Sequence, residues 1–137
     1  MTEENVPGRE RPEQAERMVL IVDDEAPARL LLRTALRGVS VPCKVVEAVS
    51  AESALEIARR TRPDLVLLDI VLPGSSVSGV LVCQELCKDS RTRVVIVSGS
   101  ATNSIVQACL SMGALEQVRK PFSVEEMQQK MEEWLTD

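Results

Sequence analysis

The chain contains no histidine and no tyrosine, and only one phenylalanine and one tryptophan. Without histidine, its four cysteines cannot be completed to a Cys/His zinc site, and none of them lie in a C-x-x-C spacing. Neither G-x-G-x-x-G nor a P-loop lysine motif is present, which disfavours nucleotide binding. No apolar run approaches the roughly 18 residues of a membrane span, and the polar N-terminus does not resemble a signal peptide. We therefore expect a cytoplasmic protein.

Length and charge narrow the class of protein further. The 137 residues are enough for one ordinary domain with a continuous core, and the 45% apolar share is mostly aliphatic. The formal charge of -5 argues against non-specific nucleic-acid binding, which draws its affinity from Lys and Arg side chains on phosphates. A single folded domain without direct nucleic-acid contact is expected.

The cysteines leave two interpretations open. Cys83 and Cys87 are one helical turn apart, a spacing that permits a joint ligand or redox role. Free cysteines also pack commonly as small apolar residues on helices. We favour packing for these two, and for Cys43 and Cys109 as well.

The order of apolar and polar segments predicts alternating strands and helices. Residues 1–17 are polar, contain two prolines and show no apolar periodicity, so we expect a flexible leader before a domain at 18–137. Strands are expected at about 18–22, 43–48, 65–69, 93–98 and 114–119. A helix follows each strand; the second begins at Ser50 or Ser53, the third covers about 79–88, and the fourth, 102–112, ends at Gly113. Nearly continuous apolar strands of this kind need cover on both faces, which predicts an α/β fold with a parallel sheet.

Polar side chains follow four of these strands at their carboxyl ends. They are Asp23, Asp24, Asp69, Ser98 and Lys120. In an open parallel sheet the functional crevice lies outside the carboxyl ends of the strands, so these residues are expected to converge.

The set suits a magnesium-assisted aspartyl-phosphate site. Mg²⁺ is usually held by one or two carboxylates together with phosphate oxygens, and a carboxylate can also attack phosphorus to form an acyl phosphate. A lysine ammonium and a hydroxyl can bind the remaining phosphoryl oxygens, tasks that fit Lys120 and Ser98.

Each residue taken alone has a plainer interpretation. An aspartate after a strand, such as Asp24, is usually a turn former or helix cap, and Ser98 alone is more often a cap or turn residue. Lys120 alone can be a solvated lysine at a strand end. Only the combination of acids, hydroxyl and ammonium at separate strand ends favours the phosphoryl site.

With these motifs in place, residues 18–136 resemble a receiver domain of the bacterial two-component response regulators. The matching segments are Val22-Asp23-Asp24-Glu25, Pro63-Asp64-Leu65-Val66-Leu67-Leu68-Asp69-Ile70-Val71-Leu72-Pro73, Val97-Ser98-Gly99 and Lys120-Pro121-Phe122. The resemblance implies a flavodoxin-like (βα)5 three-layer sandwich whose sheet has the order 2-1-3-4-5, an order for which a chemotaxis receiver is a standard example.

The resemblance also implies roles for the site residues. Asp69 would be the phosphoacceptor and Asp24 a direct Mg²⁺ ligand, with Asp23 acting through water and the backbone carbonyl of Val71 completing the metal sphere. The phosphoryl donor would be a sensor histidine kinase or a histidine phosphotransfer protein. The domain would be a signalling switch, not a dedicated enzyme, although it would promote its own phosphorylation and dephosphorylation.

By the same resemblance, Ser98 would contact the phosphoryl group and Lys120 would pair with it. Their shift would change the surface offered by the fourth helix, fifth strand and last helix to a downstream protein that the sequence does not identify. In related receivers this face often mediates dimers, so a homodimer is possible.

Three departures from the family pattern concern the output. The position three residues before the lysine usually holds Tyr or Phe and is Gln117 here, which lacks an aromatic ring for the usual switch. The interval from Asp69 to Gly79 is longer than usual by about two residues, either as a tolerated surface insertion, which we favour, or as a change in phosphoryl access. No output domain is expected after the last helix; Met1 suggests a natural start, although a receiver cut from a longer regulator fits equally.

Two other functions compete with the switch. A phosphatase of the haloacid-dehalogenase type also uses an aspartate nucleophile and Mg²⁺, but it needs a second Asp two positions later, where this chain has Val71. A receiver-like module that binds partners without being phosphorylated is the stronger alternative, and Gln117 is its best support.

Overall fold

The computed structural model describes residues 15–75 and 77–136, so most of the expected leader, residues 1–14, lies outside the described part. The sheet contains β1 (Arg17–Val22), β2 (Cys43–Ala48), β3 (Leu65–Leu68), β4 (Arg93–Ser98) and β5 (Glu116–Arg119). The helices are α1 (Ala26–Leu36), α2 (Ala51–Thr61), α3 (Gly79–Leu86), α4 (Asn103–Met112) and α5 (Val124–Thr136). Of these helices, none is both long and apolar enough to cross a membrane.

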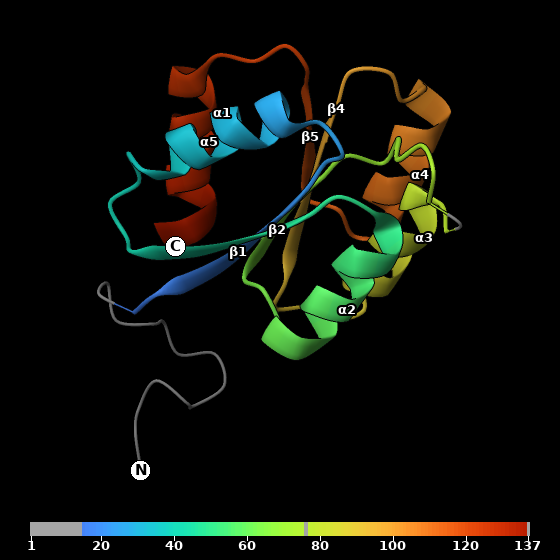
Figure 1. The fold of residues 1–137 in the computed structure, drawn as a ribbon, viewed down its shortest axis with the longest axis horizontal. Helices are drawn as coiled ribbons and strands as arrows, with labels where there is room; N and C mark the ends of the chain where they lie inside the picture. The colour runs from blue at the N-terminus through green and yellow to red at the C-terminus, as the bar shows by residue number, and fades with distance from the viewer. Residues whose placement is uncertain (1–14, 76, 137) are drawn as a thin grey trace.

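The five strands form one parallel sheet in the order β2-β1-β3-β4-β5, as expected. Helices α1 and α5 cover one face of the sheet, and α2, α3 and α4 cover the other (Figure 1). Each parallel connection crosses over through a helix, which explains why both faces are covered. The flavodoxin-like three-layer α/β fold is confirmed.

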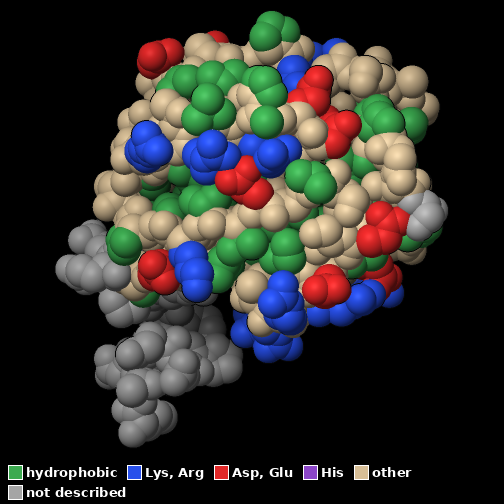
Figure 2. Space-filling model, in the orientation of Figure 1, with side chains coloured by type: hydrophobic (Ala, Val, Ile, Leu, Met, Phe, Trp, Pro, Cys, Tyr) green, Lys and Arg blue, Asp and Glu red, His purple; other side chains and the backbone are tan. Residues whose placement is uncertain are grey.

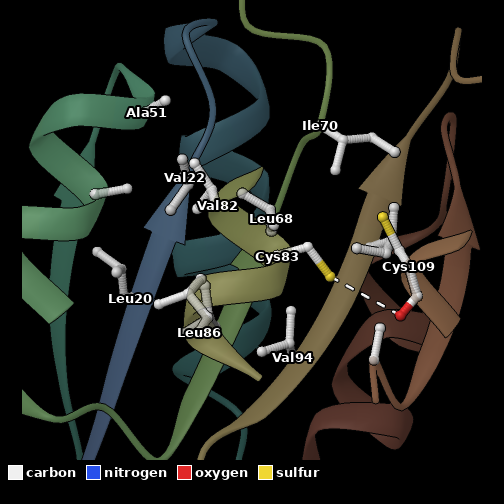
Figure 3. Close-up of a cluster of buried hydrophobic side chains, with 14 of the residues drawn as sticks. Leu20, Val22, Ala51, Leu68, Ile70, Val82, Cys83, Leu86, Val94 and Cys109 are labelled. Atoms are coloured by element: carbon white, nitrogen blue, oxygen red, sulfur yellow. Dashed lines mark hydrogen bonds between the residues drawn. The ribbon is translucent and has the colours of Figure 1, made fainter. Parts of the chain in front are cut away.

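Alternation along the strands divides the core into two clusters. In β1, Val19 and Ile21 point to the side of α1 and α5, whereas Leu20 and Val22 point to the side of α2, α3 and α4. Figure 3 shows the second cluster, in which α3 and α4 pack their buried side chains over the central strands. Aliphatic side chains make up most of both clusters, and Trp134 joins the one under α1 and α5, so the scarcity of aromatic residues leaves the fold intact.

The predicted boundaries hold to within a few residues. The second helix is capped by Ser50, whose Oγ accepts a hydrogen bond from the Ser53 amide at 3.1 Å, and the fourth ends at Gly113 as expected. The third helix is shorter than predicted because it ends at Leu86, and β5 begins at Glu116 instead of 114.

Arg17 corrects the predicted start of the domain. It was assigned to the leader, but it is the first residue of β1 and is buried. Its amide donates to the Pro42 carbonyl at 2.8 Å, and its Nε donates to the Leu135 carbonyl, in the last turn of α5, at 3.0 Å. A buried guanidinium is tolerated here because a carbonyl at the C-terminus of α5 accepts from its Nε and the Ala15 carbonyl accepts from its Nη1.

The cysteines pack as small apolar residues, the interpretation that we favoured. Cys83 and Cys109 are fully buried between α3 and α4, and the Cys83 Sγ lies 3.9 Å from the Cys109 carbonyl oxygen (Figure 3). The Cys87 Sγ is 3.9 Å from that of Cys83. Burial raises the pKa of all three thiols, which keeps them protonated near neutral pH.

Replacing Arg17 with Met tests the anchoring of α5. Methionine keeps a flexible apolar side chain but removes the Nε donor to the Leu135 carbonyl, so the free energy of unfolding is expected to fall by about 2 kcal/mol. Urea unfolding followed by fluorescence of the single, buried Trp134 measures the change. Arg37→Met, at an exposed position, is the matched control and is expected to change it by less than about 0.5 kcal/mol. Equal losses in the two variants would contradict the anchoring role.

Candidate functional site

The carboxyl ends of β1, β3, β4 and β5 bring the expected residues together. The Asp69 amide donates to the Val22 carbonyl at 2.9 Å, which places Asp69 beside the end of β1. The Lys120 amide donates to the Ser98 carbonyl at 3.3 Å, which places the residue after β5 beside the end of β4. Continuation of the parallel ladders past the strand ends therefore builds the site.

Lys120 joins two aspartates from separate strands. Its Nζ lies 2.6 Å from Asp23 Oδ2 and 3.0 Å from Asp69 Oδ2, and the two aspartate side chains are only 1% and 9% exposed. Burial alone would lower the pKa of the Lys120 ammonium, but the hydrogen bonds to Asp23 and Asp69 outweigh burial, so its pKa is raised. Lys120 is thus a fixed cation between two buried anions, not a solvated lysine.

The other carboxylate oxygens are held by the backbone. Asp23 Oδ1 accepts a hydrogen bond from the Glu25 amide at 2.9 Å, and Asp69 Oδ1 accepts one from the Val71 amide at 2.9 Å. Both bonds join a residue to the amide two positions later, the usual Asx-turn pattern. Each aspartate is therefore oriented on one side by its own loop and on the other by Lys120.

Three carboxylates are close enough to hold one metal ion. Oxygen atoms of Asp23, Asp24 and Asp69 all lie within 4.8 Å of one another. Asp24 is exposed and does not cap α1, because the N-cap residue is Glu25 and makes no side-chain capping bond. Oxygen ligands from carboxylates suit a hard cation such as Mg²⁺, so the residues present fit the ion that the sequence implied.

Ser98 is buried and its Oγ has no hydrogen-bond partner among the described residues. A buried hydroxyl without a partner costs free energy, so such atoms are rare unless a ligand completes them. The position of Ser98 at the end of β4, beside Lys120, makes this atom a donor available to a bound anion. It is neither a helix cap nor a turn residue here.

The remaining predicted residues lie at the edges of the site. Val71 lies two residues after Asp69 and is 38% exposed, while its amide donates to the Asp69 carboxylate. Gln117 lies in β5 opposite Ile96, two residues before Ser98 on the neighbouring strand, and is partly buried.

The loop between β3 and α3 is anchored at two points. The Ala51 amide, at the start of α2, donates to Ser75 Oγ at 3.0 Å. At the other end a Cβ on Gly79 would lie 2.2 Å from the Ile70 carbonyl oxygen, so the close approach requires glycine. The longer interval after Asp69 therefore folds back against α2 and the core.

Sequence reasoning missed two residues that touch the site. Arg29, in α1, donates from Nη1 to the Asp23 carbonyl at 2.9 Å, and Glu25 Oε1 lies 3.7 Å from Lys120 Nζ. A charged residue on an exposed-looking helix gives no local signal of such a contact.

The response regulator receiver domain model matches residues 19–132, so the chain belongs to this family. Receiver domains of the family are signalling switches of two-component systems, not dedicated enzymes; histidine kinases phosphorylate them, and they bind Mg²⁺ in an acidic pocket.

Similar proteins are regulators about twice as long as this chain. The "probable transcriptional regulator ycf27" of Porphyridium aerugineum is 34% identical over 113 residues, which are 82% of this chain and 45% of that protein. The DNA-binding response regulator MtrA of Mycobacterium tuberculosis (strain ATCC 25618 / H37Rv) is 36% identical over 109 residues, which are 80% and 46%. The chain thus spans about half the length of these relatives.

Solved structures have the same fold. The receiver domain of NtrX from Brucella abortus is 31% identical, with a TM-score of 0.75 over 85% of this chain and 97% of that one. Vibrio cholerae chemotaxis protein CheY4 is 23% identical, with a TM-score of 0.73 over 88% of this chain and 100% of that one, and supports the fold alone.

Ser98→Ala tests whether the Ser98 hydroxyl is unsatisfied in the resting protein. Removing a buried hydroxyl without a partner relieves a desolvation cost, so the free energy of unfolding is expected to stay constant or rise by about 1 kcal/mol. Ser50→Ala is the matched control, because it removes the cap of α2 and is expected to cost about 1 kcal/mol. Urea unfolding compares the two, and a large loss in Ser98→Ala would show that the hydroxyl is bonded.

Lys120→Met tests the fixed cation. The variant leaves Asp23 and Asp69 buried without their counter-charge, so we expect a loss of about 3 kcal/mol in unfolding free energy at neutral pH. In an Asp69→Asn background the same change leaves one fewer buried anion and is expected to cost less. The double-mutant cycle in urea measures this coupling, and purely additive losses would contradict it.

Proposed function

We propose that this domain is a phosphoacceptor switch in which Asp69 receives a phosphoryl group from a histidine kinase or a histidine phosphotransfer protein. The observation that carries the proposal is the Lys120 ammonium, which bonds to both Asp23 and Asp69. At the end of the neighbouring strand, the buried Ser98 hydroxyl has no hydrogen-bond partner among the described residues. Burying two aspartates costs free energy of folding. Their presence at this site therefore favours a role for them in its chemistry.

The transfer uses Asp69 as nucleophile. A carboxylate oxygen of Asp69 attacks phosphorus, the phosphorus–nitrogen bond of a phosphohistidine breaks, and its electron pair stays on the imidazole. Asp24, Asp69 and the Val71 carbonyl would hold Mg²⁺ directly and Asp23 would hold it through water, and the bound ion would supply neutralising charge. Lys120 then exchanges its bond to the Asp69 carboxylate for one to a phosphoryl oxygen.

Ser98 completes the phosphoryl site and starts the switch. Its Oγ donates to another phosphoryl oxygen, which satisfies the hydroxyl for the first time. Movement of Ser98 at the end of β4 is passed to Gln117 on β5, where a glutamine can reorient and form hydrogen bonds but cannot fill an aromatic pocket. The two populations of the switch then differ mainly in polar contacts along β4 and β5.

The output is proposed to be protein contact on α4, β5 and α5. Ile105 and Leu115 are exposed apolar side chains on this side of the domain, available to a downstream protein or a second copy of the chain. A partner that prefers the phosphorylated population converts the chemistry into a signal. MtrA is a DNA-binding response regulator, whereas the acidic chain here, with a formal charge of -5, acts through protein contact.

One observation favours the alternative of a module that binds partners without phosphorylation. Gln117 replaces the aromatic residue through which the family usually reports the switch. Intact placement of Asp69, Ser98 and Lys120 supports the phosphoacceptor function over this alternative.

Mass spectrometry after incubation with acetyl phosphate tests the proposed function. We expect one phosphoryl adduct on the wild-type protein with Mg²⁺ and none with EDTA, because the buried anions need the metal to accept an incoming phosphate. Asp69→Asn is the control and is expected to stay unmodified. Absence of an adduct on the wild type, with beryllofluoride also leaving the amide NMR spectrum unchanged, would favour the unphosphorylated module.

A further inference from the structure

Arg29 links the edge of the sheet to the acidic loop. Its Nε donates to Glu47 Oε1 at 2.7 Å, and its Nη1 donates to the Asp23 carbonyl at 2.9 Å. One planar guanidinium thus ties α1 and β2 to the loop that carries Asp23 and Asp24. Its side chain is only 16% exposed, so both bonds are shielded from much of the solvent screening that weakens surface pairs.

A second arginine steadies the same partner. Glu47 Oε2 accepts from Arg33 Nη1 at 2.7 Å, so each oxygen of this carboxylate is held by a different arginine of α1. Figure 2 shows basic side chains in a row over α1, next to acidic atoms over β2. Charge-assisted bonds on both oxygens hold the Glu47 carboxylate, but of the two arginines only Arg29 also reaches the acidic loop.

The Asp23 carbonyl belongs to the peptide group that joins Asp23 to Asp24. The Asp23 amide already donates to the Ala48 carbonyl at 3.1 Å, and its carboxylate is held by Lys120 and the Glu25 amide. Asp24 is exposed and has no ion pair or hydrogen bond of its carboxylate among the described residues. The direction of Asp24 therefore depends on the peptide that Arg29 holds.

We propose that Arg29 is a positioning residue for the metal-binding loop: with Glu47 it holds the Asp23–Asp24 peptide so that the Asp24 carboxylate is preset for Mg²⁺. This inference rests on the proposed function, since it concerns the metal site of that switch. Groups that orient metal ligands typically change metal affinity by about 10–100-fold when they are lost.

Electrostatics alone predicts the opposite result. Arg29 is a cation close to an acidic cluster, so removing its charge should strengthen Mg²⁺ binding by reducing repulsion. If positioning dominates, removing its hydrogen bonds should weaken Mg²⁺ binding despite the lost positive charge. The sign of the change separates the two effects.

The experiment measures Mg²⁺ affinity by isothermal titration calorimetry, without a phosphodonor, for the wild type, Arg29→Met, Arg29→Lys and Arg33→Met. Arg33→Met is the matched control. Like Arg29→Met it removes one positive charge and one hydrogen bond to Glu47, but it removes no bond to Asp23. Amide hydrogen exchange at Asp24 and Glu25 gives a second readout on the metal-free proteins. Arg29→Lys keeps the charge and is included in case Arg29→Met does not fold.

We expect about tenfold weaker binding for Arg29→Met, a smaller loss for Arg29→Lys, and a change below about twofold for Arg33→Met. Amide exchange at Asp24 and Glu25 should speed up in the Arg29 variants alone. Unchanged or tighter Mg²⁺ binding in both Arg29 variants would overturn the inference and leave the proposed function intact. No Mg²⁺ binding by the wild type would overturn both.

Discussion

The Lys120 ammonium, shared by Asp23 and Asp69, is the interaction on which the rest of the site depends. Two carboxylates this deeply buried repel each other and lose hydration, so they persist only because one cation and two backbone amides compensate them. The same arrangement leaves the protein ready for chemistry. In the resting state Lys120 and two amides compensate the carboxylates; a divalent cation would add positive charge there, and a phosphoryl group would add negative charge.

The sheet sets where this interaction can form. The backbone hydrogen bonds of the sheet continue one residue beyond β3 and join Lys120 to the end of β4. The loops after β1, β3 and β5 therefore meet within hydrogen-bond distance. Two local constraints keep the neighbouring loops close: the β3–α3 loop bonds to the start of α2 through Ser75, and Gly79 passes so near Ile70 that no Cβ fits. Arg29 performs a similar task on the opposite side, from α1 and β2.

Much of this architecture was predictable because its signals are local. Apolar runs such as Val94–Val97 identified buried strands, and Ser50 and Gly113 marked helix ends through capping chemistry. Arg17 and Arg29 were not predictable in the same way. Each is a charged side chain whose hydrogen-bond partner, the Leu135 or the Asp23 carbonyl, is defined only after the chain has folded.

The sequence by itself determined the fold class, the family and the five polar residues at the strand ends, because hydrophobic periodicity and short motifs depend only on neighbours along the chain. Tertiary structure alone decided how those residues interact. It placed Lys120 between two carboxylates, left Ser98 Oγ without a partner among residues 15–75 and 77–136, and brought Arg29 of α1 into contact with the acidic loop. These contacts join residues up to 97 positions apart, and their distances follow from packing and from the register of the sheet.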